Sequence, residues 1–272
     1  MYYFSGTGNS LHIAKELQKR IPNTTLIPMI SLLKKETVKT NADIVAIVFP
    51  LHLTTLPKPV DEFVKKLDMT SAKYAFSIIT RIGTFSTANV YLNKVLRKRG
   101  KLLDASFMIN MANNSPAGLK PFADKKWVEK ISNANVLGLE KKVQESLQFV
   151  VDCVVRREKI HANGTMSFSS HILEPIMTKL THKTSHEIPF YTDASCTGCG
   201  ICGRVCLSGK IKAVNGKVMW DESVQCFYCY ACFNFCPEQS ILIDKKYDLK
   251  NGRYHHPDID YKEICAQKDK MD

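Results

Sequence analysis

Eight of the ten cysteines in this chain of 272 residues fall in two runs with one shared spacing. The first run consists of Cys196, Cys199, Cys202 and Cys206, and the second consists of Cys226, Cys229, Cys232 and Cys236. Disulfides rarely persist in a reducing compartment, so such a density of thiols indicates a metal or redox role. Structural zinc sites use separated Cys-x2-Cys pairs, which leaves the third cysteine of each run without a purpose. The spacing therefore predicts iron–sulfur clusters.

The spacing also predicts how the ligands are shared. Thiolates at i, i+3 and i+6 hold three irons of a 4Fe-4S cubane, while the fourth cysteine of the run ligates the other cluster. We therefore expect two crossed quartets, which we name quartet one (Cys196, Cys199, Cys202, Cys236) and quartet two (Cys226, Cys229, Cys232, Cys206). This exchange requires the two halves to pack as a pseudo-twofold pair. Glycines of the first run, at 198, 200 and 203, allow backbone amides to approach the sulfurs.

Residues 188–243, which contain both runs, resemble the bacterial two-cluster ferredoxins. That family usually has a proline after the fourth cysteine of each run, and here Pro237 keeps one of these places while Leu207 takes the other. The resemblance implies a small α+β domain with low-potential clusters. Of the two remaining cysteines, Cys153 lies in an apolar helical stretch and is expected in the core, whereas Cys265 has no predicted role.

The first half of the chain alternates apolar strand-like runs with helix-like periodic ones, which is typical of an α/β domain. The pattern predicts strands at 2–4, 24–28, 43–49, 73–80 and 103–111, and helices at 9–20, 58–67 and 86–99. Apolar residues at helical spacing predict a last helix within 124–159. Right-handed crossovers would arrange the five strands as a doubly wound parallel sheet of flavodoxin type.

A loop of small and hydroxylic residues joins the first strand to the first helix. It consists of Ser5, Gly6, Thr7, Gly8, Asn9 and Ser10. Backbone N–H groups and the positive end of the helix favour a phosphate dianion there. The loop lacks the lysine of an ATP-binding P-loop, and Leu11 stands where a dinucleotide fingerprint needs a third glycine.

This loop resembles the flavodoxin phosphate motif, Ser/Thr-x-Thr-Gly-x-Ser/Thr, at Ser5, Thr7, Gly8 and Ser10. The resemblance implies FMN, bound beyond the carboxyl ends of the strands, where two further loops would flank its ring system. These loops are expected to contribute Pro50, Leu51, His52, Thr80, Arg81, Gly83 and Thr84. His52 stands where relatives often have tyrosine, and Arg81 could stabilise a reduced anionic flavin by its charge.

Together the two halves resemble a family in which a flavodoxin-like domain is fused to a two-cluster ferredoxin. We expect a flavodoxin-like domain at 1–160, a linker at 161–187 with some helix around 172–180, a ferredoxin domain at 188–243 and a polar tail at 244–272. The tail is expected to wrap over one domain or to stay mobile, and residues 252–257 resemble the family's ending.

The composition limits the partners. The formal net charge of +12 favours an acidic redox partner protein, although solvated lysines on helix faces explain the surplus equally well. No nucleic-acid motif, membrane span or secretion signal is found in the sequence, so we expect a cytoplasmic protein, and the oligomeric state stays open.

These features favour an electron carrier that links the clusters to FMN. One alternative is an FMN-dependent reductase of a small acceptor such as a quinone, fed by the ferredoxin domain and depending on His52 or Arg81. A second alternative is a redox or oxygen sensor whose α/β domain binds a partner without flavin. Whether the chain is an enzyme stays open at this stage.

Overall fold

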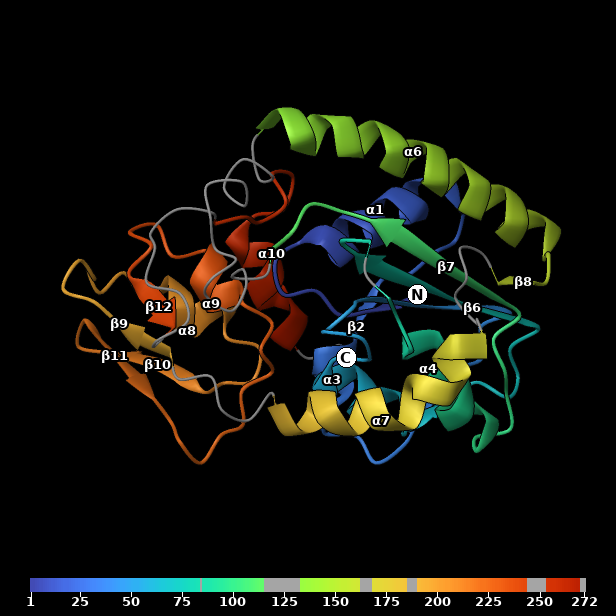
Figure 1. Cartoon of the computed structure of the whole chain (residues 1–272), viewed down its shortest axis with the longest axis horizontal. Coiled ribbons are helices and arrows are strands. Elements are labelled where there is room, and N and C mark those ends of the chain that lie inside the picture. Colours follow the sequence, from blue (N-terminus) through green and yellow to red (C-terminus); the bar gives the residue numbers. More distant parts are fainter. Residues whose placement is uncertain (84, 115–132, 162–167, 185–189, 244–252, 270–272) are drawn as a thin grey trace.

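The structure, a computed structural model, describes residues 1–83, 85–114, 133–161, 168–184, 190–243 and 253–269. Thr84 of the expected flavin loops lies outside these residues, as does the start of the expected tail at 244–252. An α/β part and a smaller cysteine-containing part lie side by side (Figure 1).

The α/β part is built on a six-stranded parallel sheet. Its strand order is β2 (Ile27–Pro28), β1 (Tyr2–Tyr3), β4 (Ile44–Pro50), β6 (Tyr74–Arg81), β7 (Ala105–Asn110) and β8 (Ile160–His161). The expectation of five strands was therefore one short. The additional strand β8 pairs only with Ala105 and Ser106 and is two residues long, which is too short to give a periodic pattern.

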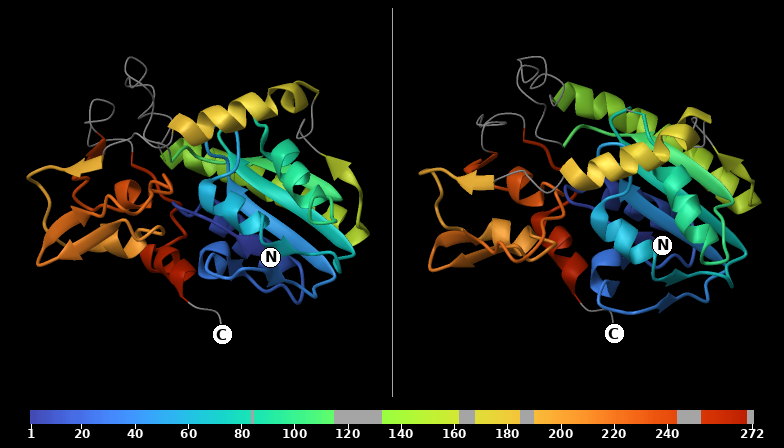
Figure 2. Two further views of the ribbon diagram at one scale, coloured as in Figure 1. Left: turned by 90° about the horizontal axis from the view of Figure 1, so that it is seen from below. Right: turned by 60° about the horizontal axis from the view of Figure 1, so that its bottom comes forward.

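Helices cover both faces of this sheet, as expected for a doubly wound fold (Figures 1 and 2). One face carries α1 (Asn9–Arg20) and α6 (Asn133–Arg156). The other carries α3 (Lys58–Val64), α4 (Ala88–Arg97) and α7 (Phe168–Thr184). Shorter elements complete this part: α2 (Met29–Leu32), β3 (Val38–Lys39) and β5 (Leu67–Asp68).

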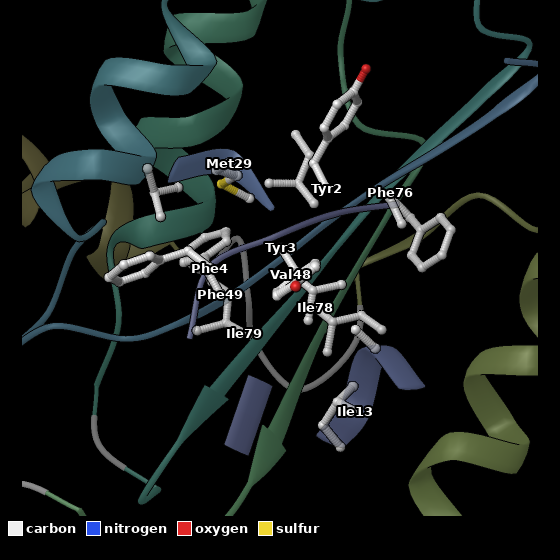
Figure 3. Close-up of a cluster of buried hydrophobic side chains, with 14 of the residues drawn as sticks. Tyr2, Tyr3, Phe4, Ile13, Met29, Val48, Phe49, Phe76, Ile78 and Ile79 are labelled. Atoms are coloured by element: carbon white, nitrogen blue, oxygen red, sulfur yellow. The ribbon is translucent and has the colours of Figure 1, made fainter. Parts of the chain in front are cut away.

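The core forms because the central strands are apolar on both faces, which is typical of a parallel sheet buried between helices. Every residue from Val45 to Phe49 on β4 is buried, and so is every residue of β6 up to Thr80. Figure 3 shows part of this core around Phe4, where β1, β4 and β6 meet the first helices. Cys153 on α6 is fully buried, which confirms the expectation of a core cysteine.

The helix expected around 172–180 is α7. It extends beyond the expected range at both ends and packs against α4. Lys94 of α4 forms an ion pair with Glu174 of α7 at 3.1 Å, and the hydroxyls of Thr55 and Thr178 lie 3.3 Å apart. Residues 168–184 of the segment expected as a linker are thus an outer helix of the α/β part.

The cysteine-containing part consists of two successive β-α-β units. The first is β9 (Phe190–Thr192), α8 (Ile201–Val205) and β10 (Ile211–Val214), and the second is β11 (Lys217–Trp220), α9 (Ala231–Asn234) and β12 (Ile241–Ile243). β9 pairs with β12 and β10 with β11, both antiparallel, while α8 packs on α9. A pseudo-twofold axis therefore relates the two units.

Residues 253–269, which we call the strap, run between the two parts and contain α10 (Tyr261–Cys265) and the 3-10 helix η1 (Ala266–Lys268). A capping box between Asp260 and Glu263 starts α10. α10 contacts α8, and η1 contacts α2, so the strap touches both parts. Among the described residues, no helix combines the length and apolarity that a membrane crossing requires.

Candidate functional site

Each expected cysteine quartet lines one cavity of the cysteine-containing part. One cavity is lined by Cys196, Cys199, Cys202 and Cys236, together with Pro237 and Gly200. The other is lined by Cys206, Cys226, Cys229 and Cys232, together with Lys210 and Trp220. In both cavities the fourth thiol comes from the other run. The structure thus brings together the quartets that the spacing predicts.

The two cysteine runs adopt matching backbone conformations despite different residues. Gly198 and Gly200 have φ angles of 72° and 75°, and Tyr228 and Tyr230, which occupy the same places in the second run, have φ angles of 50° and 57°. The left-handed conformation suits glycine but costs roughly 1–2 kcal/mol at other residues. Its appearance at two tyrosines indicates that the cysteine geometry imposes it. At Gly198 a side chain has no room, because an added Cβ would lie 2.5 Å from the carbonyl oxygen of Gly216.

The thiols of the quartets favour a cationic partner. All ten cysteines are free thiols. Burial, with a smaller contribution from neighbouring thiols, raises the pKa of Cys226 to about 11 and of Cys229 to about 12. In quartet one, burial raises the pKa of Cys202 to about 11. Converging buried thiolates are stable only beside positive charge, which the irons of a cluster supply.

Hydrogen bonds to sulfur also fit cluster ligation. The backbone N–H of Tyr228 donates to Sγ of Cys226 at 3.3 Å, and that of Ile211 donates to Sγ of Cys206 at 3.4 Å. In quartet one the N–H of Ser240 donates to Sγ of Cys236 at 3.3 Å. Such bonds tune the reduction potential of a cluster. The donor set of both cavities therefore fits 4Fe-4S clusters.

The phosphate loop, residues 5–10, lies buried at the carboxyl end of β1. The hydroxyl of Ser5 accepts a hydrogen bond from the N–H of Gly8 at 3.2 Å, and the hydroxyls of Ser10 and Thr80 lie 2.8 Å apart. Asn114 donates to the hydroxyl of Thr7. These bonds fix the loop, and they bring Thr80 of the second expected flavin loop beside it.

The start of α1 provides the donors for an anion. Gly8 has a φ of 100° and precedes the helix, and the first intrahelical bond runs from the N–H of His12 to the carbonyl of Gly8. The N–H groups of residues 9–11 therefore precede the helical ladder and point along its positive end. No acidic residue lies in the first turn. This donor set fits the phosphate of FMN.

The other expected flavin-binding residues lie at the ends of β4 and β6. The N–H of Leu51 donates to the carbonyl of Thr80 at 2.8 Å, which joins the two loops. His52 forms a bridge with Thr55 and lies edge-on to Phe4, 6.3 Å between ring centroids. Burial lowers the pKa of His52 to about 4, so the imidazole is neutral near pH 7. Pro50, the last residue of β4, pairs in register with Thr80.

On the second expected flavin loop, Nε of Arg81 donates to Oδ1 of Asn110 at 3.2 Å. Burial lowers the pKa of this guanidinium from its ordinary value, yet it stays charged. Gly83 has a φ of 91° and lies near the same Asn110 side chain. The described residues of both loops thus meet the phosphate loop at one edge of the sheet.

The strap lies over the phosphate loop. The sequence predicted that the tail would wrap over one domain or stay mobile, but not which loop it would cover. The Gln267 carboxamide accepts from the N–H of Ser5 at 3.0 Å and donates to the carbonyl of Ser5 at 2.8 Å. The N–H of His256 donates to the carbonyl of Thr7 at 2.8 Å, and the hydroxyl of Tyr254 donates to Oδ1 of Asn9 at 3.2 Å. The capping box at Asp260 was the one local signal that this tail is ordered.

Quartet two also touches the phosphate loop. A Cβ added at Gly6 would lie 2.2 Å from the carbonyl oxygen of Cys229. The contact is therefore possible only for glycine. Cys229 and Cys232 pack against the main core, which continues from the α/β part through the strap into Val205 and Leu207.

The comparisons with known proteins address the N-terminal half. Residues 1–112 match the family model of a flavodoxin domain. No curated protein matches the chain, and no solved structure does. Together with the parallel sheet, the family match confirms a flavodoxin-like α/β domain, and it supports FMN binding and flavin-linked electron transfer.

Proposed function

We propose that the chain is an electron carrier in which two 4Fe-4S clusters, held by the two quartets, exchange electrons with an FMN held at the phosphate loop. The observation that carries the proposal is the contact between Gly6 of the phosphate loop and Cys229 of quartet two. This contact would bring quartet two close to the flavin site, so that electrons could pass between a cluster and FMN without a second protein.

The groups supply complementary redox chemistry when bound, since clusters accept one electron at a time and a flavin accepts one or two. The chain's own residues hold them. Loop N–H groups and the start of α1 neutralise the phosphate, and Gln267 fixes Ser5 from the strap side. The eight thiols would bind iron in two small cavities, and burial is greater around quartet two, where it raises the pKa of Cys232 well above its ordinary value.

Quartet one is the proposed place where electrons enter or leave. Cys199 is exposed, whereas quartet two faces the α/β part. A redox partner that docks near Cys199 reaches quartet one first and the flavin last. We expect this partner to be acidic, because the net charge of +12 attracts an acidic protein over long range.

The test is anaerobic reduction of the bound FMN by a reduced bacterial ferredoxin as one-electron donor. Replacing Cys229 by serine should slow flavin reduction at least about 10-fold, because one cluster loses a ligand. The matched control is Cys265→Ser, which removes a partly buried thiol outside both quartets. Equal rates in the two variants, or purified protein without FMN, would contradict the proposal.

A further inference from the structure

Two histidines and a glutamate converge where the strap crosses α1 and α6. His12 comes from α1, Glu140 from α6 and His256 from the strap, and one ligand atom of each lies within 4.8 Å of the other two. The two imidazoles are 5% and 2% exposed, and their rings stack with centroids 3.8 Å apart at 20°. Three separate segments therefore bring two buried imidazoles and one partly exposed carboxylate together.

The atoms that face one another are those that bind transition metals. Nε2 of His12 lies 3.1 Å from Oε1 of Glu140, and Nε2 of His256 lies 3.8 Å from Oε2. In a tetrahedral site with metal–ligand bonds of roughly 2.0–2.1 Å, ligand atoms are about 3.3 Å apart. The observed separations lie on either side of this value. Because the two rings are stacked, their Nε2 lone pairs lie in nearly parallel planes, and one imidazole must rotate out of the stack to complete the site.

The surroundings of the cluster also suit a cation. Nδ1 of His12 lies 3.6 Å from Oδ2 of Asp258, as in metal sites where a carboxylate orients a ligating imidazole through its other nitrogen. Gln144 donates to Oε1 of Glu140, which holds that carboxylate. Among the described residues, the ion pairs of Glu140 involve only the two imidazoles, so a bound cation would meet no competing lysine or arginine.

We infer that His12, Glu140 and His256 bind one divalent transition-metal ion, with zinc as the matching probe, and that this ion fastens the strap beside the phosphate loop. Two imidazoles and one carboxylate leave a fourth position for water, as in known three-ligand zinc sites. The inference does not depend on flavin or clusters, since none of its ligands belongs to either quartet.

A hydrogen-bonded cluster without metal is the competing state. The N–H of Asp258 donates to Nδ1 of His256 at 3.3 Å, which leaves the proton of a neutral imidazole on Nε2, facing Glu140. Metal binding at Nε2 moves that proton to Nδ1 and breaks the bond from Asp258. The two states therefore differ in whether Nε2 holds a proton or a metal.

The experiment is a zinc titration of the full chain after its cysteines have been filled anaerobically with iron and sulfide. Wild type should bind about one zinc per chain beyond the clusters, and saturation should raise the melting temperature by about 5 °C. Glu140→Gln and His256→Gln should abolish both effects. The matched control is His255→Gln, because that neighbouring imidazole is exposed and stacks on Phe235.

X-ray absorption at the zinc edge of the wild-type protein keeps the test decisive if a variant folds poorly. Imidazole and carboxylate ligands give a first shell at about 2.0 Å, whereas thiolates give sulfur at about 2.3 Å. A shell of nitrogen and oxygen only, with retained visible absorbance of the clusters, supports the inference. A sulfur shell, no zinc binding, or equal binding by Glu140→Gln would overturn it.

Discussion

Quartet one and quartet two share their spacing and backbone turns, yet they have different surroundings. Quartet one includes the exposed Cys199 and lies beside a hairpin of the cysteine-containing part. In quartet two, burial raises the pKa of Cys232 well above its ordinary value, and Cys229 contacts Gly6 of the α/β part. One repeated unit thus provides an outer site and an inner site. Quartet one lies nearer the surface, and quartet two lies beside the phosphate loop.

Removing one ligand from each quartet in turn should give the largest effects and tests whether the outer and inner quartets differ. Cys232→Ser and Cys199→Ser should each lose about four of eight irons, because each serine disables one cluster. The inner variant should also lower the melting temperature more, since Cys232 packs against the core shared with the strap. Iron analysis and calorimetry measure both effects. Equal melting temperatures would contradict the distinction between outer and inner quartets.

Gly6→Ala should disrupt the contact between the inner quartet and the phosphate loop. The new methyl group would overlap the carbonyl of Cys229, and overpacking of this kind costs about 1–3 kcal/mol. Denaturant unfolding measures the loss. The matched control is Gly138→Ala on α6, where an added Cβ meets nothing within 4 Å and alanine should stabilise the helix by about 0.5–1 kcal/mol. A neutral Gly6→Ala would mean that the two parts do not touch there.

Gln267→Ala tests whether the strap supports the phosphate loop without affecting quartet one. The substitution removes two hydrogen bonds to the backbone of Ser5 and leaves a buried N–H and a carbonyl unpaired, at about 1–3 kcal/mol. FMN affinity should fall about 10-fold, while the iron content of quartet one stays unchanged. Fluorescence titration of FMN checks the affinity. Gln267→Glu, which keeps an acceptor for the N–H of Ser5 but buries a carboxylate against the carbonyl of the same residue, should lose at least as much stability as Gln267→Ala.

Gly198→Ala should affect the outer quartet alone. Alanine is disfavoured at a φ of 72°, and its methyl group would meet the carbonyl of Gly216 in the turn between β10 and β11, so we expect about 1–2 kcal/mol of lost stability. Electron paramagnetic resonance of the reduced protein should show a changed signal from one cluster and an unchanged signal from the other. A change in both signals, or in FMN affinity, would show that the quartets are not independent.

The sequence predicted those features that depend on residues close together in the chain. The helix at Asn9–Arg20 has the predicted bounds because Gly8 ends the loop and the apolar positions then follow a helical period. The cysteine spacing predicted which thiols would meet, since a cubane restricts the ligand order. The phosphate loop was predicted for the same reason, because its small residues lie in one short stretch.

Long-range contacts produced what the sequence did not reveal. Gln267 and Ser5 are 262 positions apart, and no periodicity marks their pairing. The strap is ordered by such bonds, by a capping box and by the burial of Ile259 and Ile264 in the main core. The strand β8 exists only because β7 offers it two partners. The cluster of His12, Glu140 and His256 likewise joins three distant segments, so spacing gave no sign of a possible metal site.

The most direct test of the account is iron, sulfide and flavin analysis of the chain purified without oxygen. We expect about eight irons, about eight sulfides and about one FMN per chain, because two cubanes and one phosphate loop are predicted. Sulfur-bound zinc in the quartets, or thiols without any metal, would contradict it.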